Sequence, residues 1–200
     1  MHIVYFDLET KYSADEVGGW GNIEDMGMSV GILWDTSDSQ FHIYLENQIQ
    51  ELVNHCKRAD QVVGFNHIGF DYRVVAGVLH AKRTDRQRAH TELVELNNCD
   101  MLVEVKKILG HRLKLDSIAR PTLGVGKSAD GLQALEWYKE GKLDKIIEYC
   151  KVDVEVTRDV HQHALKHGEL LYDSNSGVKT VKINWSQEKP KKEAEQMSLF

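Results

Sequence analysis

The most informative hydrophobic pattern lies at the N-terminus, where an apolar run ends in two acids. Residues 2–8 are mostly β-branched, aromatic or apolar, and the run is short enough to predict a buried strand rather than a helix. Side chains alternate along a strand, so Asp7 and Glu9 are expected on the same face. Two neighbouring carboxylates on a buried strand cost free energy unless a cation or protons neutralise them. The pair suggests a metal site, and two solvated acids at the start of a loop are the alternative.

Alternating and apolar runs predict three further strands and one helix in the first third of the chain. The strands are expected at 28–34, 41–45 and 61–65. Residues 11–26 are rich in Gly, Asp, Glu and Asn and predict a loop, and the turn residues of 35–39 predict a hairpin. Residues 48–58 carry apolar side chains at helical spacing. The expected order is therefore three strands, a helix and a fourth strand.

The remainder of the chain is predicted to be mainly helical. Helices are expected at roughly 69–82, 100–109, 113–123, 130–140 and 143–166. Residues 83–91 are polar and basic and predict a loop, followed by a short strand at 93–96. Turn residues and alternation over 170–185 predict a C-terminal β-hairpin. From Ser186 onward the charged, proline-containing sequence predicts a disordered tail.

Composition narrows the class of protein. A chain of 200 residues with 42% hydrophobic content predicts one globular domain, residues 1–185, with residues 186–200 as a flexible tail. No apolar run is long enough to cross a bilayer and no signal peptide is visible, so a cytoplasmic protein without membrane contact is expected. The three widely spaced cysteines predict small core residues in a reducing compartment.

The charge of the chain limits how it could bind nucleic acid. A formal net charge of −6 argues against a protein that coats nucleic acid through a basic surface. It does not exclude an enzyme that holds a few terminal nucleotides through metal ions. The loop with Gly124 and Gly126 lacks the spacing of a phosphate-binding loop.

Three separated segments carry acids in a definite order along the chain. The first is Phe6-Asp7-Leu8-Glu9-Thr10, an apolar strand ending in D-x-E. The second runs from Gly64 to Asp71 and places Asn66 before a Phe-Asp pair. The third is Tyr149-Cys150-Lys151-Val152-Asp153. Together they resemble the DEDD family of 3′–5′ exonucleases, which belongs to the ribonuclease H-like superfamily. The third segment matches the tyrosine subclass, and Glu148 stands where the histidine form would have its histidine. The resemblance spans residues 1 to about 166, and its strength lies in the order of three individually weak motifs.

The resemblance implies an α/β fold with a ribonuclease H-like mixed sheet flanked by helices. It also implies two divalent cations, Mg²⁺ or Mn²⁺, which prefer the oxygen ligands that Asp and Glu provide. Two such ions roughly 3.5–4 Å apart can activate water and neutralise charge on the attacking and leaving oxygens of a phosphodiester. Asp7 would bridge both ions, Glu9 and Asp153 would complete one site, and Asp71 would hold the other ion. Tyr149 would orient the attacking water, against the alternative of an ordinary core tyrosine.

Other polar residues carry weaker expectations. Thr10, Asn66 and Lys127 are candidates for substrate contact, and for Lys127 a solvated loop lysine is the competing interpretation. Asp100 is expected to be a helix N-cap rather than a fifth acidic ligand. The histidines of the long C-terminal helix are expected at the surface: His161, His163 and His167.

The last five residues, Gln196-Met197-Ser198-Leu199-Phe200, resemble the Q-x-x-L-F peptide by which bacterial replication and repair proteins dock on the sliding clamp. An apolar pair on a polar tether has no core to join, which favours a partner pocket for Gln196, Leu199 and Phe200. A chance match to a short pattern is the alternative. Tethering to a ring around DNA would raise the effective concentration of an acidic enzyme at DNA ends.

These observations predict a metal-dependent 3′–5′ exonuclease that releases nucleotides from single-stranded ends, with DNA favoured over RNA only by the tail. The same motifs occur in exoribonucleases, so RNA processing is the alternative enzyme. A non-catalytic module that binds nucleic acid or a clamp is the alternative of another class. The complete set of four acids and a tyrosine speaks against that module, which would not need all five.

Overall fold

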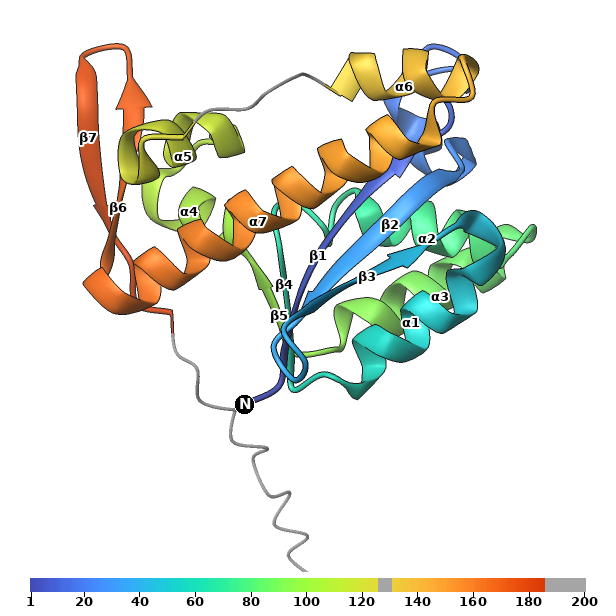
Figure 1. The fold of residues 1–200 in the computed structure, drawn as a ribbon, viewed down its shortest axis with the longest axis horizontal. Helices are drawn as coiled ribbons and strands as arrows, with labels where there is room; N and C mark the ends of the chain where they lie inside the picture. The colour runs from blue at the N-terminus through green and yellow to red at the C-terminus, as the bar shows by residue number, and fades with distance from the viewer. Residues whose placement is uncertain (126–130, 186–200) are drawn as a thin grey trace, which may run out of the picture.

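A mixed five-stranded sheet forms the centre of the protein, with the strand order β3-β2-β1-β4-β5 (Figure 1). The computed structural model describes residues 1–125 and 131–185. The strands are β1 (Ile3–Thr10), β2 (Met28–Asp35), β3 (Gln40–Tyr44), β4 (Gln61–Gly64) and β5 (Asn98–Asp100). β2 pairs antiparallel with β1 and β3, whereas β4 pairs parallel with β1 and β5. The predicted mixed sheet is confirmed.

Helices cover both faces of this sheet. One face packs against α4 (Met101–Leu109), α5 (Leu115–Leu123), α6 (Gly131–Lys139) and α7 (Leu143–His167). The other packs against α1 (Ile49–Arg58), α2 (Asp71–Leu79) and α3 (Arg83–Val94). Two 3₁₀ helices, η1 (Trp20–Asp25) and η2 (Glu46–Gln48), lie in connections. Tyr5 of β1 faces α7, whereas Phe6 faces α1 and α2, so alternation along β1 divides its side chains between two cores.

The helix α7 is the longest element and runs across the sheet over β1 and β2 (Figure 1). Its 25 residues have a wide apolar stripe that includes Ile146, Val154 and Val160. Gly168 ends the helix in the left-handed conformation, with φ 69°. The hairpin of β6 (Glu169–Ser174) and β7 (Gly177–Lys182) follows, and β6 packs against α5 and α7. The predicted long helix and hairpin are therefore confirmed.

The region between residues 83 and 100 differs from the prediction. The expected loop over 83–91 is the beginning of α3, and the expected strand at 93–96 is partly the end of the same helix. The strand β5 lies further on, at Asn98–Asp100. Only two side chains of α3 are buried, so the helix has almost no apolar stripe for a pattern to detect. Polar contacts hold it instead, including the bond from Arg86 to Asp25 at 2.7 Å.

Three smaller expectations are also corrected. The expected loop over 11–26 contains η1, and the helix expected over 69–82 is the shorter α2. His161 is buried rather than at the surface, whereas His163 is half-buried and His167 is exposed. The three cysteines are free and buried, as predicted.

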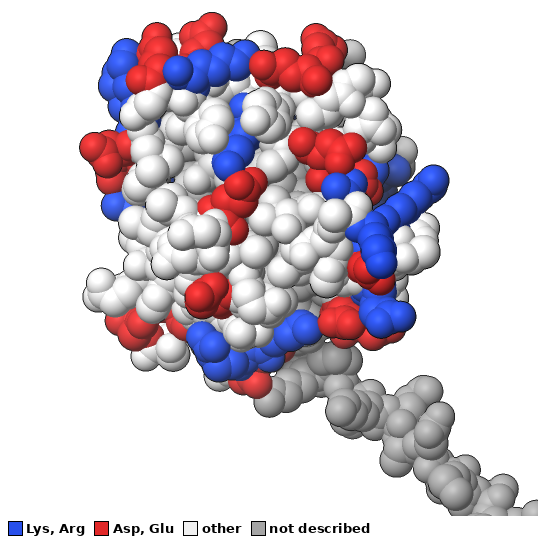
Figure 2. Space-filling view, turned by 90° about the vertical axis from the view of Figure 1, so that its right-hand side faces the viewer, with Lys and Arg blue, Asp and Glu red and all other residues white. Residues whose placement is uncertain are grey.

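The surface in Figure 2 carries separate groups of both signs, some of them near its centre, with uncharged areas between them, so no single basic area dominates this face. None of the helices in the described part of the chain is long and apolar enough to cross a membrane. The expected tail, residues 186–200, lies outside the described residues.

Candidate active site

The two acids of β1 point to the face of the sheet that α7 covers. Ile3 and Tyr5 pack on that side, and the alternation of the strand places Asp7 and Glu9 on the same side. The register between β1 and β2 shifts between Glu9 and Thr10, as in a β-bulge at the end of the pairing. Pairing to β2 thus extends past both acids, and the expectation of a loop with solvated acids does not describe this strand.

Asp153 reaches the same point from α7. A carboxylate oxygen from each of Asp7, Glu9 and Asp153 lies within 4.8 Å of the others. Asp153 is 5% exposed, and the two β1 acids are half-buried. Three clustered carboxylates form an all-oxygen donor set, which suits a hard divalent cation such as Mg²⁺ or Mn²⁺.

Asp71 approaches the cluster from the other side of the strand. It is the first residue of α2, and its carboxylate accepts a hydrogen bond from the backbone N–H of Leu8 at 3.1 Å. Burial and the nearby charge of Asp7 raise the pKa of Asp71 well above its ordinary value. A buried carboxylate beside another carboxylate is costly, and a bound cation would relieve that cost.

The loop that leads to Asp71 is shaped by Asp100. Asn66 has a left-handed backbone with φ 68°, and the Asp100 carboxylate accepts from the N–H groups of Asn66 at 2.8 Å and Ile68 at 3.0 Å. The same carboxylate accepts from the N–H of Leu102 at 3.1 Å at the start of α4. The expected N-cap is therefore present. Its second role escaped sequence reasoning because the two loop N–H groups are more than thirty residues away.

Tyr149 lies one turn before Asp153 on the same helix. It is 5% exposed, it lines the same cleft as the four acids, and the ring of Trp137 from α6 meets its ring edge-on at 6.2 Å. This contact packs the Tyr149 ring of α7 against α6.

Cys150 adds a contact that sequence reasoning missed. Its thiol is fully buried and donates weak hydrogen bonds to the backbone oxygen of Asp7 at 3.6 Å and to its carboxylate at 3.5 Å. Burial and the nearby carboxylates raise the pKa of the thiol, so it stays protonated and able to donate. The sequence feature that could have indicated this contact is the position of Cys150 between Tyr149 and Asp153, on the part of α7 that packs against β1.

The acids and Tyr149 line one cleft with a volume of about 530 Å³. Its wall also contains apolar and aromatic side chains: Tyr12, Trp20, Phe65, Phe70, Leu132 and Leu135. Trp20 is 70% exposed and its ring lies 6.4 Å from that of Phe70. The 3₁₀ helix that carries Trp20 is held to α2 by two bonds from Arg73 to Glu24, at 2.7 and 2.8 Å. Gly77 allows this packing, because a Cβ there would lie 1.7 Å from the backbone oxygen of Glu24.

Of the three residues predicted to contact substrate, two lie in the cleft and one lies outside the described residues. Thr10 and Asn66 line the cleft. The hydroxyl of Thr10 donates to the backbone oxygen of Tyr12 at 3.1 Å, and the side-chain oxygen of Asn66 accepts from Arg112 at 3.0 Å. Arg112 is exposed and escaped sequence reasoning because no motif contains it. Lys127 lies outside the described residues, as do Gln196, Leu199 and Phe200.

Comparisons with solved structures agree with this architecture. The family B DNA polymerase from the hyperthermophilic archaeon Pyrobaculum calidifontis matches with a TM-score of 0.61 and 16% sequence identity. The match covers 82% of this chain and 24% of the polymerase chain. At that identity the likeness concerns the fold alone. No curated protein matches the chain significantly.

The sequence model of the RNase H superfamily matches residues 4–165. The matched range contains the central sheet except for Ile3, together with the cleft and the four acids. The fold class predicted from the three motifs is thereby confirmed. Because the match covers most of the sequence, the chain belongs to the RNase H superfamily.

Proposed function

We propose that this protein is a metal-dependent 3′–5′ exonuclease that hydrolyses terminal phosphodiester bonds of single-stranded nucleic acid. The observation that carries the proposal is the meeting of Asp7, Glu9, Asp71 and Asp153 with Tyr149 in one cleft. These residues come from three segments separated by more than sixty and more than seventy positions. Membership of the RNase H superfamily supports nuclease chemistry, and the resemblance to the tyrosine subclass of DEDD exonucleases supports the 3′–5′ direction.

The roles of the residues follow from their positions and donor atoms. Two divalent cations, when bound, would supply an activated water and neutralise charge on the attacking and leaving oxygens. Asp7, Glu9 and Asp153 would hold one of them, because their oxygens already lie within 4.8 Å of one another. Asp71 would hold the second ion together with Asp7. Among the neighbouring charges, that of Asp7 raises the pKa of Asp71 most. The Tyr149 hydroxyl would orient the water that attacks the phosphorus.

The wall of the cleft supports a single-stranded substrate. Trp20 and Tyr12 are 70% and 47% exposed, so their rings are open to stacking with unpaired bases. Stacking on aromatic rings tolerates any base, which suits an enzyme that removes nucleotides in succession. Asn66 lines the cleft and its side-chain oxygen accepts from the exposed Arg112, so a phosphate near Asn66 would find an amide donor and a positive charge close by.

The experiment is a parallel digestion of matched DNA and RNA oligonucleotides labelled at either end. Each is incubated with Mg²⁺, with Mn²⁺ and with a chelator. We expect shortening of 5′-labelled DNA from its 3′ end, release of label from 3′-labelled DNA, and no reaction with the chelator. Faster degradation of RNA would assign the chain to exoribonucleases. Absence of hydrolysis with every metal and strand would contradict the proposal and favour a binding module.

We also propose that the terminal Gln196-Met197-Ser198-Leu199-Phe200 docks on a sliding clamp. The support is the sequence alone: a Q-x-x-L-F pattern at the end of a polar segment. Deletion of residues 196–200 should abolish co-migration with the clamp in size-exclusion chromatography while activity on short oligonucleotides stays unchanged. The matched control is Met197→Ala, which alters a position that the pattern leaves free. Unchanged clamp association after the deletion would contradict this proposal and would leave the exonuclease proposal unaffected.

A further inference from the structure

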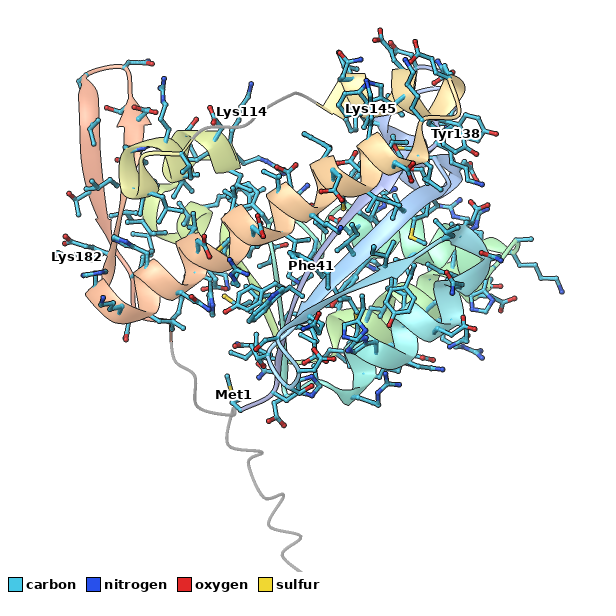
Figure 3. All side chains as sticks on the ribbon, viewed as in Figure 1. Met1, Phe41, Lys114, Tyr138, Lys145 and Lys182 are labelled. Carbon is cyan, nitrogen blue, oxygen red and sulfur yellow. The ribbon has the colours of Figure 1, made fainter. Side chains whose placement is uncertain are left out.

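A second polar cluster lies at the end of the sheet away from the cleft. It combines His2, which precedes β1, Asp35, which ends β2, and His55, which lies near the end of α1. In Figure 3, Met1, which precedes His2, is labelled at the bottom of the molecule, and Tyr138 of α6, the helix that supplies Leu132 and Leu135 to the cleft wall, is labelled at the top. The cluster takes no part in the proposed exonuclease reaction, and the inference drawn from it does not depend on that function.

The three side chains converge on one point. The Nε2 atom of His55 lies 2.6 Å from one oxygen of Asp35, and the Nε2 atom of His2 lies 2.8 Å from the other oxygen. One ligand atom from each of the three residues lies within 4.8 Å of the others. Asp35 is 3% and His55 4% exposed, so two of the three donors are removed from water.

The Nε2 atom of His55 is hydrogen-bonded to Asp35, whereas the direction of the His2 ring differs from that of an ordinary hydrogen-bonded group. Its Nε2 atom is inaccessible to water and makes no hydrogen bond of acceptable geometry, although Asp35 is only 2.8 Å away. The Nε2 atom of His2 thus lies close to the Asp35 carboxylate without being hydrogen-bonded to it. This placement is expected of two side chains that bind the same metal ion. An unsatisfied buried nitrogen is otherwise costly.

The partner of the second imidazole nitrogen also fits a metal ligand. The Nδ1 atom of His55 is 2.7 Å from the hydroxyl of Tyr44. Metal-binding histidines generally use their other ring nitrogen in such a bond, which fixes the ring and selects the tautomer. His42 packs edge-on against His55 at 4.6 Å, but its Nε2 atom is engaged by Asp38 at 2.9 Å, so it is not included in the ligand set.

We propose that His2, Asp35 and His55 form a Zn²⁺ site that links the beginning of β1, the end of β2 and α1. Two imidazoles and one carboxylate suit zinc, whereas Mg²⁺ prefers a set made of oxygens only. The protein thus has two cation sites of different chemistry, one of carboxylates at the cleft and one rich in imidazole at the opposite end of the sheet.

The experiment must separate this site from two others that could attract zinc. Excess Mg²⁺ is added to compete for the carboxylates of the cleft, and the variant His163→Gln removes the other histidine pair, in which the rings of His163 and His167 lie 4.3 Å apart. Zn²⁺ is titrated by calorimetry into the full chain without an affinity tag, into the His2→Gln variant and into the His163→Gln variant. His2 is half-buried, so its loss should leave the fold intact.

We expect one equivalent of Zn²⁺ to bind tightly to the unchanged protein and to the His163→Gln variant. Binding to His2→Gln should be at least about 100-fold weaker, which is more than the roughly 10–100-fold cost of losing a supporting group. At a free zinc concentration of about 100 times Kd, the melting temperature should rise by roughly 5–10 °C in the unchanged protein and not in His2→Gln. Equal affinities for the unchanged protein and His2→Gln would overturn the proposal, as would the absence of a stoichiometric site in the presence of Mg²⁺.

A measurement on the unchanged protein covers the case in which a variant fails to fold. The imidazole nitrogens of His2 and His55 should shift together in ¹H–¹⁵N spectra when one equivalent of Zn²⁺ is added, and those of the exposed His111 should not. Shifts confined to His163 and His167 would place the ion on α7 and contradict the proposal.

Discussion

Helix α7 meets β1 at two places where polar side chains lie together, and the two places differ in charge. Near the cleft, Asp153 lies beside Asp7 and Glu9. Further along the helix, the hydroxyl of Tyr5 is bonded to Nδ1 of His161 at 3.1 Å. Burial raises the pKa of Tyr5 to about 12 and lowers that of His161 to about 4, so this second pair is neutral near pH 7.

The comparison shows which buried polar groups indicate a site. Tyr5 and His161 satisfy each other, and the stacked ring of Trp185 covers His161, so their arrangement is explained by packing alone. The carboxylates at the cleft gather charge of one sign, and packing does not explain why they are placed together. An arrangement that costs stability in the absence of a cation points to a function that requires one.

The largest expected effect concerns the cluster of Asp7, Glu9 and Asp153 at the cleft. Asp153→Asn should lower metal-dependent hydrolysis by at least about a thousand-fold, because one oxygen ligand of the cation loses its charge. Initial rates on a 5′-labelled oligonucleotide measure this. Glu148→Gln is the matched control, since Glu148 is exposed on the same helix. Full activity of Asp153→Asn would show that the acids of this cluster are not a catalytic metal site.

The next effect tests Tyr149, which shares the helix turn with Asp153. Tyr149→Phe keeps the packing against Trp137 and removes only the hydroxyl. We expect kcat to fall about 100-fold with little change in KM, because a group that orients water acts in the reaction step rather than in binding. Tyr138→Phe on α6 is the control. A rise in KM at unchanged kcat would assign the hydroxyl to substrate binding instead.

The neutral pair of Tyr5 and His161 should affect the stability of the protein rather than its activity. The pKa of His161 is about 4 in the fold against an ordinary value of 6.5, so the unfolded chain binds more protons between these values. Stability from this residue is fully present above pH 6.5 and is lost as the pH falls towards 4, by up to about 3 kcal/mol. Urea unfolding at pH 7 and pH 4 measures the difference.

The control for this measurement separates His161 from the general effect of acid. His161→Gln should reduce the loss between pH 7 and pH 4 by about 3 kcal/mol, whereas His111→Gln, at an exposed position, should leave it unchanged. An identical loss in His161→Gln and in the unchanged protein would mean that the pair with Tyr5 is not a neutral one.

The smallest expected effect tests directly how much stability the protein loses by burying carboxylates together at the cleft. Asp71→Asn keeps an acceptor for the N–H of Leu8 and removes a buried negative charge beside Asp7. We expect the metal-free protein to gain about 1 kcal/mol, a rise in melting temperature of about 2–4 °C, and the stabilisation by Mg²⁺ to shrink. Thermal melting with and without Mg²⁺ checks both. A destabilised metal-free variant would indicate that the charge at the start of α2 helps the helix more than its burial costs.

Sequence patterns predicted the elements whose apolar side chains form a clear run or period. β1 was predicted from its short apolar run and α7 from apolar residues at helical spacing, and the alternation of side chains along a strand placed Asp7 and Glu9 on one face. Helix α3 was missed because it buries only Ala89 and Leu93 and is held by ion pairs with distant residues, such as Lys57 with Glu92 at 3.0 Å.

The candidate sites show the same limit. The acids of the cleft could be proposed because three motifs resemble a known family in their order. The cluster of His2, Asp35 and His55 contains no motif and joins residues 33 and 20 positions apart, so only the fold brings it together. Arg112 and Cys150 were missed for a related reason, since each acts through a contact with a residue of a motif rather than through the motif itself.

The carboxylate of Asp100 ties the loop before Asp71 to the first turn of α4 through the amides of Asn66, Ile68 and Leu102. Amides that share one buried acceptor open together, because loss of one bond exposes the charge to water and weakens the others. The back of the cleft and the start of α4 should therefore form one cooperative unit in hydrogen exchange. The three amides should exchange at closely similar rates, slower than those of the surrounding loop.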